Sequence, residues 1–150
     1  MPYINRNIQI ITNKGILRIV VLMFFSTLLF NNNMQGQSIN EIKTQCIKAL
    51  QTNNIDNFVS TFSNPIEIAL PEKENSYSKI QAQEVMRKFL KENKTKSFKV
   101  KQSGKSTGGS EFVIAILKTE SNIEYQLYLL ITNSDNKANL HLVEFELNDE

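Results

Sequence analysis

Polar and apolar positions follow a helical period over residues 38–50. Ser38 and Glu41 stand three residues apart, in the pattern of a capping box that starts a helix. Apolar residues then recur at every third or fourth position as far as Leu50, which predicts one buried helical face. Asn53 and Asn54 interrupt the period, so the first helix is expected to end there.

Two further helices are predicted. Residues 55–62 again carry apolar side chains at helical spacing, and Asn64-Pro65 is expected to end this short helix. The residue before a proline disfavours helical angles, which is the reason for that boundary. Ser78 and Gln81 form a second capping box, and the apolar face behind them runs to Leu90.

Strand patterns fill the rest of this region. Residues 66–70 alternate apolar and other side chains, with Glu67 as the single acid, and Pro71 closes the segment. From Ser97 onward the period is two, which predicts four strands over residues 98–102, 112–117, 123–131 and 138–147. The second of the four is apolar on both faces and is expected to be central. Short connections, including the loop at 103–109, favour an antiparallel meander.

The first 36 residues follow another pattern. Three basic residues and no acid precede an uncharged apolar run from Ile19 to Phe30, and a polar Asn-rich break follows. The run is short for a helix that spans a bilayer, which needs about 20 apolar residues. We therefore interpret residues 1–36 as a signal peptide, cut after Gly36, and residues 37–150 as one periplasmic or secreted domain. An uncleaved membrane anchor is the alternative.

Removal of this segment changes the charge of the protein. The whole chain has a net charge of +2, whereas residues 37–150 hold 14 basic and 15 acidic residues, a net charge of −1. The basic isoelectric point is therefore no argument for nucleic acid as a partner. Cys46 is the single cysteine, so neither an internal disulfide nor a cysteine-rich metal site can form, and no cofactor is expected.

The order of elements resembles the NTF2-like, or cystatin-like, superfamily, in which a curved antiparallel sheet wraps around helices as a cone. The segments 65–71 and 109–112, and the helix after Tyr77-Ser78, also resemble the DUF4783 family of exported Bacteroidota proteins. The resemblance covers about residues 38–147. It implies an α+β fold with three N-terminal helices on the sheet and a cavity between the layers. It implies no functional residues, because the family has no defining catalytic motif.

Three side chains are candidates for acid–base chemistry. His141 is the single histidine and shares the parity of Val143 and Phe145 in the last strand, so it could line the cavity as a general acid or base. Tyr125 and Glu67 could form the tyrosine and acid of an isomerase-like pocket. The alternative is that all three are structural or solvated residues without a catalytic role.

Basic residues are dense between positions 87 and 105, where only Glu92 opposes them. Such a cluster could attract a polyanion, or it could be a solvated surface. Gly104-Lys105-Ser106 resembles the end of a phosphate-binding loop, but Lys99 stands where that motif needs glycine, and the segment joins two strands. We therefore exclude that motif. The cluster consists of Arg87, Lys88, Lys91, Lys94, Lys96, Lys99, Lys101 and Lys105.

The sequence favours a non-enzymatic domain that binds a small apolar ligand or an envelope protein. The alternative is a small isomerase or dehydratase with an acid and a base in its pocket. A homodimer is a further expectation, because sheets of the resembled kind often pair face to face. Contact with a membrane is expected only if the signal stays uncleaved.

Overall fold

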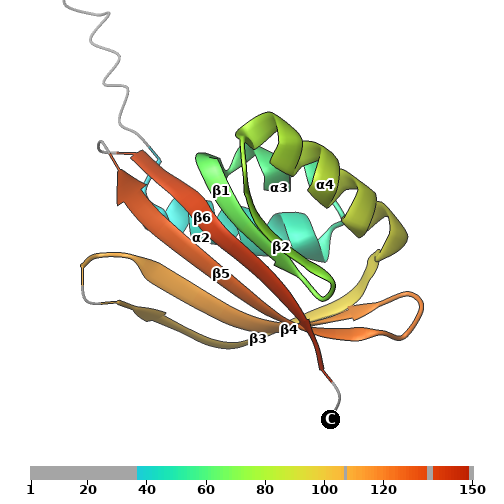
Figure 1. Cartoon of the computed structure of the whole chain (residues 1–150). Coiled ribbons are helices and arrows are strands. Elements are labelled where there is room, and N and C mark those ends of the chain that lie inside the picture. The colour runs from blue at the N-terminus through green and yellow to red at the C-terminus, as the bar shows by residue number, and fades with distance from the viewer. Residues whose placement is uncertain (1–36, 107, 135–136, 149–150) are drawn as a thin grey trace, which may run out of the picture. The chain divides into compact units, whose positions relative to one another are not determined.

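The computed structural model describes residues 37–106, 108–134 and 137–148, so the predicted signal peptide lies outside the described residues. Residues 35–150 form a compact unit of their own. Three helices and six strands make up its described part, in an α+β arrangement (Figure 1). They are α2 (Ile39–Gln51), α3 (Ile55–Ser60), β1 (Phe62–Leu70), β2 (Lys73–Tyr77), α4 (Lys79–Glu92), β3 (Thr95–Lys105), β4 (Glu111–Thr119), β5 (Glu124–Ser134) and β6 (Lys137–Leu147).

Both predicted capping boxes are confirmed. The Ser38 hydroxyl accepts a hydrogen bond from the Glu41 backbone, and the Glu41 carboxylate accepts one from the Ser38 backbone at 2.8 Å. Ser78 and Gln81 make the same reciprocal pair at the start of α4. Because each box satisfies backbone N–H groups that a helix leaves free, the polar residues fix where α2 and α4 begin.

Two predicted boundaries are wrong. Helix α3 ends at Ser60 rather than at Asn64-Pro65, and β1 already begins at Phe62 and runs through the proline. The pairing of β1 with β6 shifts between Phe62 and Glu67, as expected where Pro65 cannot donate to the ladder. Similarly, β3 continues to Lys105, so Gly104 pairs with Phe112 inside a strand instead of lying in the predicted loop.

The six strands form one curved sheet in the order β2-β1-β6-β5-β4-β3. The four C-terminal strands pair antiparallel, which confirms the predicted meander. The sheet as a whole is mixed, because β1 pairs with β6 in parallel, and the expectation of a purely antiparallel sheet is wrong. β4 is flanked on both sides, as its apolar faces indicated, but it lies next to the edge strand β3 rather than at the centre.

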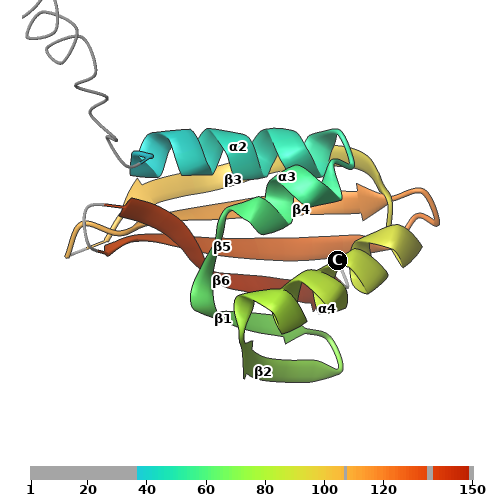
Figure 2. The same cartoon turned by 90° about the horizontal axis from the view of Figure 1, so that it is seen from above.

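The three helices pack against one face of the sheet, which we call the inner face. Figure 2 shows α2 alongside β3 and β4, and α4 near β1 and β2. Alternate residues of β4, β5 and β6 contribute buried side chains to the core between helices and sheet. The largest fully buried side chains include Phe58, Phe62, Met86 and Phe145, so the space between the helices and the sheet is filled by side chains.

Candidate functional site

His141 does not occupy the position that simple alternation predicts. The pairing of β5 with β6 shifts between Leu130 and Ile131, which pair with Leu142 and Leu140 respectively, so His141 is the extra residue of a β-bulge. Leu140 and Val143 are both fully buried on the inner face, whereas His141 is half-buried. The prediction that His141 shares the face of Val143 and Phe145 is therefore wrong, because the bulge shifts the alternation of inward and outward side chains along β6.

Glu67 lies close to His141 along the sheet but faces away from the core. It is exposed, and it pairs with Leu142 of β6 and Ser76 of β2. Its neighbours Ile66 and Ile68 are buried, as the alternation of residues 66–70 predicted. This carboxylate is therefore on the outer face, in contact with water.

Tyr125 lies far from His141 along the sheet, because it pairs with the end of β6, whereas His141 is near the middle of that strand. It pairs with Leu147, six residues along β6 from the histidine, and a strand rises about 3.3 Å per residue. The two positions are therefore separated by about 20 Å. The structure does not bring His141, Tyr125 and Glu67 together in one site.

Tyr125 instead belongs to an aromatic cluster under the end of the sheet. Its side chain is only 5% exposed and packs edge-on against Phe89 and Phe145, with ring centroids 5.5 and 5.9 Å away. Its hydroxyl donates to Oδ1 of Asn93 at 3.1 Å, and Nδ2 of Asn93 donates to the Phe89 carbonyl at 3.0 Å. Burial raises the pKa of the Tyr125 phenol, so the neutral donor is the stable form.

A cleft of about 620 Å³ opens above this cluster. We call it the end cleft. Four segments that are distant in sequence build its walls: the β1–β2 turn, the C-terminal half of α4, the start of β5 and the end of β6. Its lining residues are Leu70, Pro71, Glu72, Lys73, Val85, Lys88, Phe89, Glu92, Asn93, Ile123, Tyr125 and Leu147.

The end cleft has apolar walls and a charged rim. Ile123 and Leu147 are 39% and 47% exposed, and they rank among the exposed large hydrophobic residues of the described chain. Four charged side chains, two acidic and two basic, stand at the rim, and both acids are exposed. Apart from Tyr125, the residues of this site were not predicted from the sequence. Ile123 was expected in the strand 123–131, but it lies between the Ser121-Asn122 turn and the start of β5 and is exposed.

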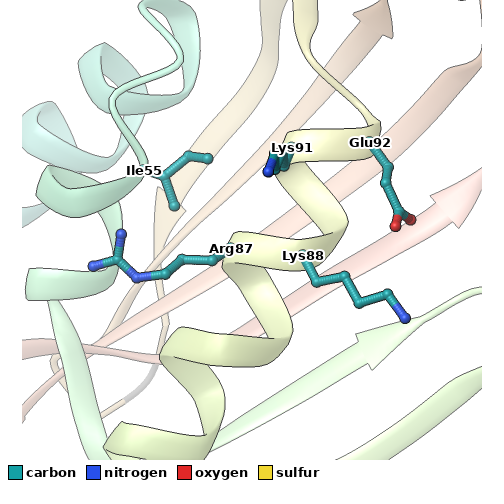
Figure 3. Close-up of a pocket in the computed structure, with 5 residues that line it drawn as sticks. All are labelled: Ile55, Arg87, Lys88, Lys91 and Glu92. Atoms are coloured by element: carbon teal, nitrogen blue, oxygen red, sulfur yellow. The ribbon is translucent and has the colours of Figure 1, made fainter.

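A second hollow, the basic groove, lies on the other side of α4 and has a volume of about 750 Å³. It is lined by Ile55, Arg87, Lys88, Lys91 and Glu92. Figure 3 shows Arg87 extending toward α3, with Lys91 on the same side of α4 as Ile55, whereas Lys88 and Glu92 extend from the opposite side of α4. Arg87 forms an ion pair with Asp56 of α3.

The predicted basic cluster is distributed over several elements. Arg87, Lys88 and Lys91 belong to α4, and the last four lysines belong to the edge strand β3. All eight side chains are exposed. The cluster is therefore not one compact patch, and of its residues the end cleft and the basic groove include only those of α4.

Cys46 is buried between α2 and α3 and has no contact with either hollow. Its Sγ donates to Oγ1 of Thr61 at 3.4 Å, and burial raises the pKa of the thiol to about 12. Among the described residues, no group of three or more histidine, cysteine, aspartate or glutamate side chains is arranged to hold a metal ion. Within the same residues, no helix is both long and apolar enough to cross a bilayer.

Comparison with known proteins places this architecture in a family. The family model of DUF4783, a domain of unknown function, matches residues 43–146. The chain belongs to the DUF4783 family. Its fold is similar to that of a DUF4783 protein from Bacteroides uniformis, with 24% identity and a TM-score of 0.66 over 71% of this chain and 97% of that one.

The wider similarities of this DUF4783 protein are to NTF2-like structures. An NTF2-like protein of unknown function from Cytophaga hutchinsonii has 13% identity and a TM-score of 0.55, over 77% of this chain and 95% of that one. A protein from Kribbella flavida, provisionally described as a ketosteroid isomerase, has 10% identity and a TM-score of 0.54, over 75% and 78% of the two chains. These similarities establish the fold alone. No curated protein matches the chain.

Proposed function

We propose that this DUF4783 protein is a binding protein for a small, largely apolar ligand, and that the end cleft is its binding site. The observation that carries the proposal is the convergence of Ile123 and Leu147 with Leu70 and Pro71 above an aromatic floor. These apolar side chains come from three separate segments, and covering them with a ligand lowers the free energy, because it removes apolar surface from water. The volume is also in the range of small-molecule sites, which is about 300–1,000 Å³.

The same geometry supports binding rather than catalysis. An isomerase-like site needs an acid kept neutral by apolar surroundings and a hydroxyl free to donate to the substrate. Glu72 and Glu92 stand at the exposed rim of the cleft, and the Tyr125 hydroxyl already donates to Asn93. His141 lies about 20 Å away along β6, too far to act on a ligand in the cleft.

The test uses an uncharged apolar probe, N-phenyl-1-naphthylamine, whose fluorescence rises when it leaves water. The purified protein should enhance its fluorescence, and Ile123→Asp should weaken the binding about tenfold or more, because a buried charge opposes an apolar contact. Val100→Asp is the matched control, because Val100 is also 39% exposed but lies on β3, outside the cleft. Equal binding by the two variants would refute the proposed site.

A second candidate function is self-association through the outer face of the sheet. Phe112, Leu130 and Leu142 lie opposite one another on β4, β5 and β6, with Ile114 and Tyr128 in the next row. All five are half-buried on the face away from the three described helices. Light scattering tests this proposal: wild type should be a dimer that Leu130→Asp dissociates, and a monomeric wild type at high concentration would contradict it.

A further inference from the structure

The end cleft and the basic groove are neighbours that share two residues. Lys88 and Glu92 line both hollows. They lie one turn apart on the part of α4 that separates the two hollows, which we call the ridge of α4. On one side of the ridge lie the apolar walls of the end cleft, which include Leu70, Ile123 and Leu147. On the groove side, Figure 3 shows Arg87 and Lys91 beside Ile55. One elongated molecule could therefore contact both surfaces by crossing a single helix.

The two hollows differ in charge. The rim of the end cleft is balanced, with Glu72 and Glu92 against Lys73 and Lys88. The basic groove has three cations and one acid, and Asp56 pairs only with Arg87.

Two of the groove cations are available to a ligand. Neither Lys88 nor Lys91 makes a hydrogen bond or ion pair within the part of the chain that the structure describes, and both are exposed. With Arg87 paired to Asp56, the groove side holds these two lysines against Glu92, so it keeps a net positive charge that attracts an anion.

We infer that the ligand is an anionic amphiphile, whose alkyl chain lies in the end cleft and whose negatively charged head group lies over the ridge of α4, next to Lys88 and Lys91. This inference rests on the proposed function of the end cleft, because the apolar walls hold the chain. A head group with phosphate or carboxylate oxygens fits two flexible ammonium groups, which act as point charges without a fixed geometry.

The test compares three probes that share one chain: decyl phosphate, decanol and decyltrimethylammonium. Each is titrated to displace N-phenyl-1-naphthylamine from the purified protein, the two ionic compounds below their micelle concentrations and decanol below its solubility limit. Decyl phosphate should bind about tenfold more tightly than decanol, since an exposed ion pair contributes at most about a fivefold change in affinity and two lysines are involved. Decyltrimethylammonium should bind more weakly than decanol.

Paired variants locate the head group. The double variant Lys88→Gln with Lys91→Gln removes both cations that would pair with the head group. It should therefore reduce the preference for decyl phosphate over decanol to about twofold or less. The matched double variant Lys99→Gln with Lys101→Gln removes the same charge from β3, outside both hollows, and should keep the preference. Added salt should also reduce the preference, because the lysines are exposed.

The outcomes separate the two proposals. If no decyl compound displaces the probe, the proposed function fails, and this inference fails with it. If all three bind equally, or if the lysine double variant keeps the preference, the cleft binds apolar ligands but the inferred head group is wrong. If inorganic phosphate alone competes as well as decyl phosphate, the site is a phosphate site, and the amphiphile is refuted.

Discussion

Asn53 connects α2 to α3 and ties that junction to the start of β3. Its backbone has a φ of 53°, in the left-handed region, and its side-chain amide bonds to both backbone groups of Thr95. Nδ2 of Asn53 donates to the Thr95 carbonyl at 3.0 Å, and the Thr95 N–H donates to Oδ1 at 2.7 Å. Because Thr95 is only 7% exposed, water can replace these bonds only in part.

The change Asn53→Ala removes both bonds and keeps the unfavourable φ. Each lost hydrogen bond is expected to cost about 1 kcal/mol of folding free energy. A left-handed φ costs an alanine about 1 kcal/mol more, because its Cβ approaches the carbonyl and it lacks the local hydrogen bonds of asparagine. The expected destabilisation is about 3 kcal/mol. Asn53→Gly loses the bonds but relieves the φ, so it should cost about 1 kcal/mol less.

Asn122→Ala serves as the control for the backbone cost. Asn122 also has a positive φ, of 62°, but its side chain only accepts a hydrogen bond from exposed Lys96 at 3.2 Å. It should therefore lose about 1 kcal/mol. Urea unfolding followed by far-UV circular dichroism measures all three variants, since the chain has no tryptophan. A loss below 1 kcal/mol for Asn53→Ala, or a loss equal to that of Asn122→Ala, would refute the reasoning.

Four further predictions concern Cys46, Lys79 and the N-terminal segment. The Cys46 thiol should not react with Ellman's reagent at pH 8 until the protein is unfolded in urea, because burial raises its pKa from 9.0 to about 12. Because the folded state holds the thiol proton more tightly, stability should fall as the pH rises from 9 toward 12, and Cys46→Ala should remove that part of the loss. Lys79→Met should cost about 1–2 kcal/mol of unfolding free energy, measured by urea titration, because the Lys79 ammonium donates to the carbonyls of Ser60 and Phe62, both at 2.9 Å. The intact mass of the protein from its native cells should correspond to a chain that begins at Gln37, and a full-length mass would contradict cleavage.

Several features of the fold could be predicted because they depend on neighbours in sequence. A capping box needs two residues three apart, so Ser38 and Ser78 marked the starts of α2 and α4 correctly. Period-two alternation and short turns indicated the four-strand meander. Tyr125 alternates in phase with Leu127 and Leu129 along β5, and all three side chains are buried. These signals depend on residues that are close in sequence, and the tertiary structure keeps the elements that they predict.

The rest was decided by contacts between distant segments. The parallel pairing of β1 with β6 joins residues that are 75 to 78 positions apart in sequence, as in Glu67 with Leu142 and Phe62 with Leu140, and nothing near either strand specifies its partner. The bulge at His141 changes which side chains face the core, because one extra residue reverses the alternation after it.

The end cleft shows the same limit for function. Leu70, Val85, Ile123 and Leu147 each look like ordinary core or strand residues in the sequence, and they become the walls of one site only where the ends of three strands and α4 meet. The sequence determined which segments become helices and strands, because those choices follow from periodicity and caps. The tertiary structure decided which apolar side chains remain uncovered, because burial depends on what packs against them.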